Sequence, residues 1–449
     1  MEQERKTKKQ KQKQIQKLSL IQNAPLEGKV VLVRFDHNVV KDGEIRDPYR
    51  IDRSLGTLYN IVERGGRPIL MTHIGRPKDR EGKITCKEGE SVRPVVEYLE
   101  RKLHVKFLVP YFPAEPGQGI KNIDTSINHA IKALRERRAG GIYLPNTRWF
   151  SGEQGTGETR ERFSLQLAGL ADIYVNDAFG SWQPHVSTLD ITEHLPSYAG
   201  YLMQVEIENL NHVLSPERPF LAVVAGSKYD TKIRPLYEIY RKADRLILGG
   251  VIYNTFLAAK YGITVKGVTM EDIEAAKGLA REDSSRKKII ELPFVIESDV
   301  PDGRVEGRFR KVAVRDFKKG EGYNYFLDIA AESFADPRVL ESLLGAKTIF
   351  VNAVMGYTPH FTEGSKALDE TIDRNSTARK LYGGGDTLQE FKNLCPGLYL
   401  SVLDNARYYF FTGGGTVLTA IEKGSPYGLE PVHALLEKEA PAYASGNGR

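Results

Sequence analysis

One recurring pattern limits the possible folds of this chain more than any other. Short, continuous apolar runs end in glycine or in a polar residue, and each is followed by a segment with helical spacing. Such runs lead, for example, to Asp36, Asn176 and Asn352. Continuous apolar runs are typical of strands that are buried on both faces of a parallel sheet. Strands that alternate with helices predict right-handed crossovers. We therefore expect an α/β fold built from doubly wound, Rossmann-like parallel sheets.

The length of 449 residues predicts two such domains. Between the early and the late apolar runs lies a segment with helical spacing of its apolar residues, which are Leu202, Met203, Ile207, Leu210 and Leu214. We expect a hinge helix here, capped by Ser197, that joins a domain of residues 21–205 to a domain of residues 206–449. The end of the chain could return to the first domain. Residues 298–324 are expected to form short strands or an edge hairpin.

Residues 1–20 are rich in lysine and glutamine and contain no aromatic residue. This composition favours a basic, disordered tail that aids solubility, and a tether for RNA or another acidic surface is the alternative. The sequence has neither the apolar core of a signal peptide nor a run long enough to span a membrane. Two cysteines, Cys86 and Cys395, make no disulfide framework. We therefore expect a cytoplasmic protein.

Ligands of open α/β sheets bind at the carboxyl ends of the strands. The early strand ends carry a largely basic set that could hold an anion: Asp36, Asn38, His73, Arg76, Asn146 and Arg148. The late strand ends carry glycines with Lys228, Asn352 and Asp386, and this set could hold a nucleotide. A single polar residue at a strand end is more often a turn or cap residue than a ligand. Because many early strand ends carry basic or polar residues and many late ones carry glycine, we favour two binding sites.

Two glycine runs, at residues 383–385 and 413–415, sharpen the nucleotide hypothesis. Glycines let backbone N–H groups approach phosphate oxygens closely, and a helix that starts at Asp386 would add its positive end. The Asp386 carboxylate is a suitable ligand for Mg²⁺. The alternative, a tight strand-to-helix turn, explains one such run better than two. The P-loop, dinucleotide, metalloprotease and hydrolase fingerprints are all missing from the sequence.

Ten ordered segments resemble the phosphoglycerate kinase family, from about residue 25 to about residue 435. In this sequence they read VLVRFDHNVV…DPYRI, ILMTHIGRPK, PNTRWFSGE, DIYVNDAFG, LPSYAGYLM, AGSKYDTKI, GGVIYNTFL, VNAVMG, GGGDT and TGGG. The resemblance implies reversible phosphoryl transfer between 1,3-bisphosphoglycerate with ADP and 3-phosphoglycerate with ATP, a reaction of glycolysis and gluconeogenesis. It also implies that Mg²⁺ accompanies the nucleotide and that the enzyme is a monomer that acts on small molecules. A role in binding nucleic acid is not expected.

The resemblance also implies roles for individual residues. In the first domain, those that would bind the glycerate, its phosphate and its carboxyl group are Asp36, Asn38, Arg50, His73, Arg76 and Arg148. Arg50, Lys228 and Lys232 would reach the phosphoryl group in transfer. In the second domain, the residues that would line the nucleotide site are Gly226, Lys228, Lys232, Gly249, Gly250, Asn352, Gly383, Gly384, Gly385, Asp386 and Thr387. Asp386 would hold the metal ion.

Two segments depart from the family pattern. Residues 181–188 read SWQPHVST, without the arginine that usually adds to the acid site. Residues 352–363 lack, at its usual spacing, the glutamate that usually binds the ribose, and Glu363 lies only close to that position. Three hypotheses follow, in this order: a divergent phosphoglycerate kinase, a related kinase with altered acid or nucleotide specificity, and a binding protein without catalysis.

Overall fold

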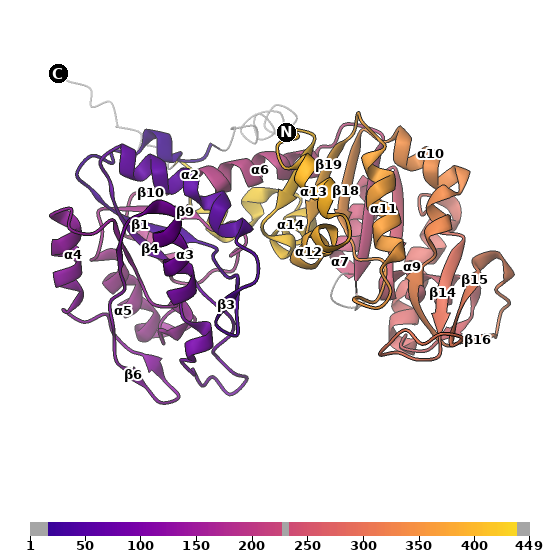
Figure 1. Cartoon of the computed structure of the whole chain (residues 1–449), viewed down its shortest axis with the longest axis horizontal. Helices are drawn as coiled ribbons and strands as arrows, with labels where there is room; N and C mark the ends of the chain where they lie inside the picture. Colours follow the sequence, from indigo (N-terminus) through magenta and orange to yellow (C-terminus); the bar gives the residue numbers. More distant parts are fainter. Residues whose placement is uncertain (1–16, 227–232, 438–449) are drawn as a thin grey trace, which may run out of the picture. The chain divides into compact units, whose positions relative to one another are not determined.

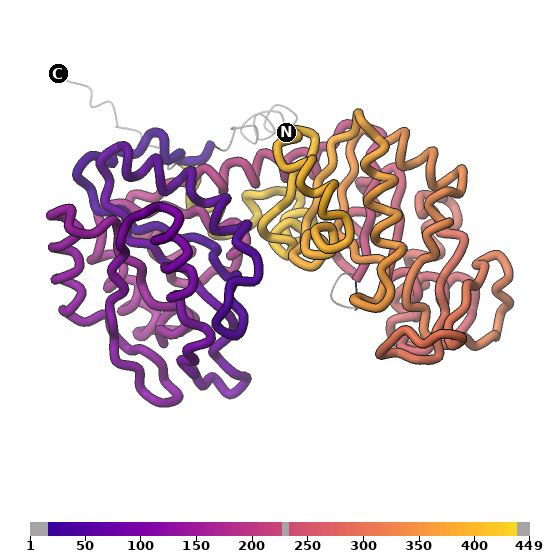
Figure 2. Tube along the Cα trace, viewed as in Figure 1, coloured from indigo at the N-terminus to yellow at the C-terminus, as the bar shows by residue number. Residues whose placement is uncertain are grey.

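The computed structural model describes residues 17–226 and 233–437, which form two compact units (Figure 1). One unit is drawn from Met1–Val205 and Tyr427–Arg449, and the other is Glu206–Pro426. The colours of Figure 2 follow the chain from its indigo start in the first unit into the second, and Figure 1 labels the connecting helix α6 (Tyr201–Leu214). Within the described residues, no helix is both long and apolar enough to cross a membrane.

The first unit is built on a six-stranded sheet with the order β10-β9-β1-β4-β8-β5, and all its strand pairs are parallel. The strands are β1 (Val30–Phe35), β4 (Arg67–Met71), β5 (Phe107–Leu108), β8 (Gly141–Tyr143), β9 (Ile173–Asp177) and β10 (Ser197–Ala199). The chain adds strands on one side of β1 as far as β8 and then returns to its other side with β9. The topological switch point, where α/β sheets bind ligands, therefore lies between β1 and β9.

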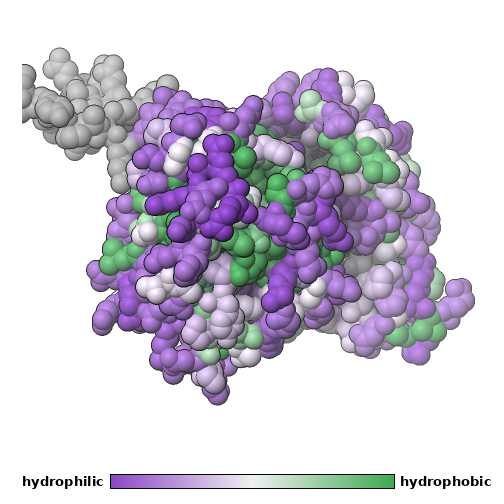
Figure 3. Space-filling view, turned by 60° about the vertical axis from the view of Figure 1, so that its left-hand side comes forward, coloured by the Kyte–Doolittle hydropathy of each residue, from purple (hydrophilic) through white to green (hydrophobic). Residues whose placement is uncertain are grey.

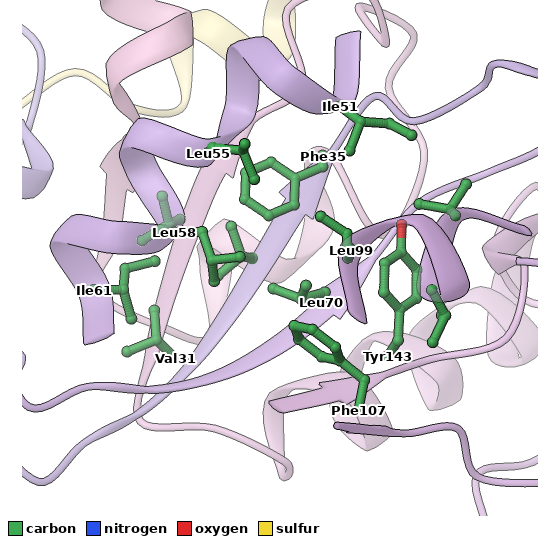
Figure 4. Packing of buried hydrophobic residues seen from close by; sticks show 14 of the residues in the cluster. Val31, Phe35, Ile51, Leu55, Leu58, Ile61, Leu70, Leu99, Phe107 and Tyr143 are labelled. Atoms are coloured by element: carbon green, nitrogen blue, oxygen red, sulfur yellow. The ribbon is translucent and has the colours of Figure 1, made fainter. Parts of the chain in front are cut away.

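Helices cover both faces of this sheet, which explains why its strands are apolar throughout. The covering helices are α2 (Tyr49–Glu63), α3 (Arg93–Leu103), α4 (Ile127–Arg135) and α5 (Gly157–Ala168). Val31 and Phe35 of β1 pack with α2 and α3, and Figure 4 shows these residues against Ile51, Leu55 and Leu99. The alternate β1 residues Val30 and Leu32 pack on the opposite face with α4 and α5. Short pairs of strands, β2 (Val40–Lys41) with β3 (Glu44–Ile45) and β6 (Ala114–Glu115) with β7 (Gly119–Ile120), lie outside the main sheet.

The second unit is built on a five-stranded parallel sheet with the order β12-β11-β18-β19-β20. Its strands are β11 (Phe220–Gly226), β12 (Arg245–Gly249), β18 (Thr348–Asn352), β19 (Arg379–Gly383) and β20 (Tyr408–Phe411). Its helices are α7 (Ile233–Lys242), α8 (Gly250–Tyr261), α9 (Met270–Arg286), α10 (Pro337–Gly345), α11 (Glu363–Asp373), α12 (Gly385–Leu394), α13 (Pro396–Val402) and α14 (Gly414–Lys423). The switch point here lies between β11 and β18. The predicted α/β class with doubly wound parallel sheets is confirmed.

Residues 298–324, expected to form short strands or an edge hairpin, supply the second strand of an antiparallel hairpin whose first strand lies mostly before this segment. Strands β14 (Phe294–Ser298) and β15 (Phe309–Ala313) pair in antiparallel fashion, and β17 (Tyr325–Ile329) joins them in a separate three-stranded sheet. A further small pair joins β13 (Thr264–Val265) and β16 (Gly322–Tyr323). Hydrophilic side chains cover most of the face shown in Figure 3, and apolar residues are exposed between them in smaller patches.

Helix α6 begins later than the sequence suggested, and its predicted cap is wrong. Ser197 lies in β10, where it pairs with Tyr174. The first turn of α6 is capped instead by residues from elsewhere: Thr57 accepts a hydrogen bond from the Tyr201 amide at 2.8 Å, and Asp177 accepts one from the Met203 amide at 3.0 Å. Burial raises the pKa of Asp177 to about 6.

The boundary of the basic tail needs correction as well. Residues 1–16 lie outside the described residues. Leu18, which the prediction assigned to the tail, is buried and pairs with Leu436, and Leu20 pairs with Ala199 of β10. Residues 427–437, including α15 (Glu430–His433), pack with the first unit rather than with the second. The start and the end of the described chain thus hold each other against the first sheet.

Candidate functional site

The residues predicted to bind an anion in the first unit gather at the carboxyl edge of its sheet. Asp36 and Asn38 follow β1, His73 follows β4, and Arg148 lies just beyond β8. Arg50 reaches the same edge from the first turn of α2. Parallel strands bring these ends together although the chain separates them, which is why the sequence pattern predicted a common site.

Asp36 and Arg50 form the centre of this cluster. The Arg50 guanidinium donates to Asp36 Oδ2 at 3.1 Å, and the Asp36 side chain is almost fully buried. The second oxygen, Oδ1, is buried and has no hydrogen-bond partner within the described part of the chain. A buried acceptor without a partner is costly, so this oxygen is suited to a ligand that carries a hydroxyl group.

His73 lies beside a buried arginine that the sequence analysis did not single out. Arg34, inside β1, is fully buried and places Nη2 3.0 Å from His73 Nδ1, while its Nε donates to the Ser187 hydroxyl at 2.9 Å. Burial, followed by the charge of Arg34, holds the pKa of His73 well below its ordinary value. Because a guanidinium can only donate, Nδ1 accepts and the proton of the neutral ring lies on Nε2. His73 can therefore donate to an anion without carrying a charge.

The loops after β4 and β8 are locked together. Asn38 Oδ1 accepts from the Gly75 amide at 2.9 Å, and Arg148 Nη1 donates to the Gly75 carbonyl at 2.6 Å. Asn146 accepts from the Ile74 amide at 3.1 Å and donates to its carbonyl at 2.8 Å. Arg148 Nε is buried without a partner among the described residues. The site therefore offers a donor as well as an acceptor.

The divergent segment at residues 181–188 closes one side of this cluster. Gln183 Oε1 lies 3.5 Å from Arg148 Nη2, and Ser181 Oγ lies 3.5 Å from His73 Nδ1. His185 contacts Gln154 instead, with 3.2 Å between their side-chain nitrogens. An uncharged amide thus stands next to Arg148 in the segment where the family usually has an arginine. Arg76 is exposed at the outer edge of the cluster. Burial, followed by the charge of Arg34, lowers the pKa of Arg148, and the charge of Arg76 contributes less in the same direction.

The second unit has a cavity of about 430 Å³ at its switch point. Most of the predicted nucleotide residues that the structure describes line it, namely Gly226, Gly250, Asn352, Gly384, Gly385, Asp386 and Thr387. The remaining walls are largely apolar and include Phe326, Leu327, Val354 and Met355. Gly249 and Gly383 lie behind this lining, where Gly249 packs against Met355. Lys228 and Lys232 lie outside the described residues.

The two glycine runs meet at this cavity. A Cβ on Gly414 would lie 2.7 Å from the Gly384 nitrogen, so the two turns are in backbone contact. Gly384 has a φ of 129° and precedes α12, and Asn352 donates to the carbonyl of Gly383. A side chain at Gly384 would be strained and would crowd Thr387. The glycines therefore bring the amino ends of α12 and α14 together, where their N–H groups favour an anion.

Asp386 is exposed in the first turn of α12 and borders the same cavity. The described residues contain no group of three or more metal-ligating side chains. A single exposed carboxylate beside a phosphate-sized cradle nevertheless suits Mg²⁺, which binds through one or two carboxylates plus phosphate oxygens and keeps several waters. The residues present therefore fit Mg²⁺ held with a nucleotide.

Comparison with protein families matches residues 21–424 to "Phosphoglycerate kinase". The chain belongs to the phosphoglycerate kinase family. The family expected from the sequence is thus confirmed, and so is the expected class of enzyme, a phosphotransferase.

Individual relatives agree with this assignment. The chain is 33% identical over 414 residues to a phosphoglycerate kinase of Rubrobacter xylanophilus, with 90% of this chain and 95% of the relative covered. It is 34% identical over 415 residues to one of Thermus thermophilus, with 90% and 96% covered. The solved structure of phosphoglycerate kinase from Coxiella burnetii superposes with a TM-score of 0.71 at 27% identity, and covers 93% of this chain and 98% of the other.

The structure adds a functional-site residue that the sequence did not point to, Arg34. Arg34 is a charged residue inside an apolar run, and this break in the pattern was the available signal. Its partners Ser187 and His73 are distant in the sequence, so their contact could not be read from it. Glu153 supports the same network, since it is fully buried and accepts from the Ser187 amide at 2.9 Å.

We expect a Gly414→Ala substitution to separate the two glycine turns, because the new Cβ would clash with the backbone of Gly384. Overpacking of this kind costs about 1–3 kcal/mol. Urea unfolding followed by circular dichroism measures it. Gly385→Ala is the control, since a Cβ there meets no atom within 4 Å. Equal unfolding midpoints for the two variants would contradict the packing argument.

Proposed function

We propose that this enzyme transfers a phosphoryl group reversibly between 1,3-bisphosphoglycerate and ADP, which yields 3-phosphoglycerate and ATP. The observation that carries the proposal is the contrast between the carboxyl edges of the two sheets. One edge is lined by arginines and a partly unpaired carboxylate, and the other has an apolar cavity that ends in a double glycine turn. A small organic anion fits the first, and a nucleotide fits the second.

On the acid side, Asp36 Oδ1 would accept a hydrogen bond from the glycerate hydroxyl. Arg76 and Arg148, with neutral His73 as an additional donor, would bind the phosphate and carboxyl groups. Arg50 would balance the charge of the transferring phosphoryl group. Hydrogen bonds from charged donors to such anions contribute about 1.5–3 kcal/mol each.

On the nucleotide side, the apolar wall formed by Phe326, Leu327 and Met355 would hold the base. The amides of the Gly383–Gly385 turn and the hydroxyl of Thr387 would bind phosphate oxygens. Asp386 would hold Mg²⁺, which when bound neutralises part of the phosphate charge. Lys228 and Lys232 are proposed to act on the same phosphates.

The chemistry needs no general base, since the attacking carboxylate has a pKa of about 4 and is ionised at neutral pH. Phosphoryl transfer depends mainly on alignment and on charge compensation. An acyl phosphate must also be protected from water, and we propose that a hinge motion at α6 brings the two units together around the substrates.

A coupled assay with 3-phosphoglycerate, ATP and Mg²⁺ tests the proposal. We expect ATP-dependent turnover that is lost when any one of the three is left out. Activity at the background level with every nucleoside triphosphate would reject it. An active enzyme that prefers another carboxylic acid would favour the second hypothesis, altered acid specificity, for which Gln183 beside Arg148 is the supporting feature.

We expect weak discrimination between nucleotides. Asp386 is the only carboxylate among the described residues that line the cavity, and it belongs to the phosphate end. Glu363 forms an ion pair with Arg304 and does not line the cavity. A hydrogen bond from a ribose hydroxyl to a carboxylate would favour ADP over dADP by about 1.5–3 kcal/mol. Because the described lining offers no carboxylate at the ribose end, dADP should be used with a kcat/KM within about fivefold of that for ADP. A preference for ADP of more than a hundredfold would contradict this expectation.

We also propose that the enzyme is a cytoplasmic monomer. Both cysteines, Cys86 and Cys395, are free thiols, which suits a reducing compartment. Light scattering of the purified protein tests the oligomeric state.

A further inference from the structure

An arginine outside both predicted sites lies against two aromatic rings in the second unit. Arg304 lies in the loop that joins β14 to β15. Its guanidinium carbon lies 4.6 Å from the ring centre of Phe309 and 5.3 Å from that of Phe361. The two rings are 6.0 Å apart and nearly perpendicular, at 86°. Phe309 begins β15, whereas Phe361 belongs to the loop before α11, so the guanidinium joins two separate parts of the unit.

Arg304 makes two further contacts with the loop before α11. It forms an ion pair with Glu363, the first residue of α11, and donates to the carbonyl of His360 at 3.5 Å. A planar guanidinium can stack on rings and donate in its plane at the same time, which an ammonium cannot do. One side chain therefore fixes three positions of the loop: residues 360, 361 and 363.

This loop continues directly into the wall of the cavity. Residues 352–358 line the cavity, and residues 360–363 follow at once. The tip is folded back on itself, since the amide of Phe361 donates to the carbonyl of Tyr357 at 3.0 Å. Gly356 packs against the backbone of Phe361 so closely that it has no room for a Cβ. A shift of Phe361 must therefore move Gly356 and Tyr357, which line the cavity.

The opposite side of the same wall is fixed independently. The Tyr357 amide donates to the Leu327 carbonyl at 2.7 Å, and the Met355 amide donates to the Ser365 hydroxyl at 2.9 Å. Asp328 accepts from the Gly364 amide at 3.2 Å. These hydrogen bonds hold the inner half of the loop, and Arg304 supplies side-chain contacts to its outer half.

We propose that Arg304 is a positioning residue for nucleotide binding. By holding Phe361 and Glu363 it fixes the wall at Met355–Thr358 in the shape that accepts the base and ribose. The nature of the ligand rests on the proposed function, but the positioning role rests on the contacts of Arg304 alone.

The test compares Arg304→Gln and Arg304→Lys with the unchanged enzyme. Arg304 and Glu363 are both exposed, so the usual sizes of exposed cation–π and exposed ion-pair contributions apply. Isothermal titration calorimetry with Mg·ADP should therefore show a Kd about fivefold to twentyfold higher for Arg304→Gln. The KM for 3-phosphoglycerate should stay within about twofold, because the acid site is in the other unit. Arg304→Lys should recover part of the affinity, since it keeps the charge opposite Glu363 but loses the stacking.

Arg308→Gln is the matched control. Arg308 lies in the same loop, and its guanidinium pairs with Asp299 at 3.0 Å rather than with the loop before α11. We expect its Kd for Mg·ADP to be unchanged. If Arg304→Gln does not fold, Glu363→Gln replaces it, with an expected weakening of about threefold or more from loss of the ion pair.

Two results would overturn the inference: unchanged Mg·ADP affinity in the Arg304→Gln variant, or an equal loss in the Arg308→Gln control. A loss of thermal stability without a loss of affinity would also overturn it, because that is the result of a merely structural contact. Because the calorimetry uses Mg·ADP without 3-phosphoglycerate, it tests the positioning role of Arg304 separately from the proposed function. An enzyme that binds Mg·ADP but never phosphorylates 3-phosphoglycerate would reject the proposed function and leave this inference in place.

Discussion

Replacing Arg50 with glutamine should lower kcat for ATP formation by about a hundredfold to a thousandfold, the usual effect of removing a charged group that stabilises a transition state. Arg50 is partly exposed at the acid site, and its ion pair with Asp36, at 3.1 Å, already holds it in place. A fixed guanidinium needs no reorganisation when charge develops on the transferring phosphoryl group. The coupled assay at saturating substrates measures the change.

The same substitution also has a structural effect that must be separated from catalysis. Asp36 would be left almost fully buried with neither oxygen paired within the described residues, and a buried charge that loses its partner costs about 3–5 kcal/mol. The double variant Asp36→Asn with Arg50→Gln removes that charge. It should regain most of the lost stability in urea unfolding without regaining kcat.

Arg46→Gln is the control for this experiment, because Arg46 is an exposed arginine directly after β3. Among the described residues, its side chain pairs with Asp42, at 3.5 Å. We expect its kcat and stability to remain unchanged, as is usual for exposed pairs. If the double variant regained full activity, Arg50 would serve only to neutralise Asp36, and its proposed catalytic role would be wrong.

The clustering of the candidate residues was predictable from the sequence because parallel sheets collect strand ends at one edge. That rule alone places Asp36 near His73 and Arg148, and it places Asn352 near the glycine turn at 383–385. The glycine turns were predictable for a different reason. The close backbone approach between Gly384 and Gly414 tolerates no Cβ, so it requires glycine at positions that can be recognised in the sequence.

The features that could not be predicted depend on partners distant in the sequence. Ser197 has the residue type of a helix cap, but pairing with β9 holds it in a strand, and Asp177 caps the helix instead. Leu18 follows a lysine-rich tail, yet its pairing with Leu436 at the other end of the chain buries it. In both cases a tertiary contact outweighs the local preference.

Glu363 shows the same limit at the functional site. In the sequence it lies close to where the family usually has a ribose-binding glutamate, but its spacing does not match. In the structure it is the first residue of α11 and pairs with Arg304, and the described lining of the cavity does not include it. Sequence spacing gave the approximate location of Glu363, but only the fold shows that its carboxylate pairs with Arg304.

Replacing Asp386 with asparagine should lower Mg²⁺-dependent kcat by about a hundredfold or more, because a neutral amide is a much weaker ligand for a hard cation that takes few protein ligands. The carboxylate is exposed in the first turn of α12, so the fold does not depend on it. Loss of its favourable interaction with the helix dipole should cost only about 0.3–1 kcal/mol. Titration of Mg²⁺ in the coupled assay measures the effect.

The matched control is Glu271→Gln, which removes an exposed acid from the first turn of α9 in the same unit. Both variants should lose a similar, small amount of stability, because both lose an acid at the start of a helix. Only Asp386→Asn should need a higher Mg²⁺ concentration and show the lower kcat. If Asp386→Asn kept its kcat within about threefold at the usual Mg²⁺ concentration, the metal ion would have to be held elsewhere. The glycine turns would then be a phosphate cradle that does not include its neighbouring carboxylate.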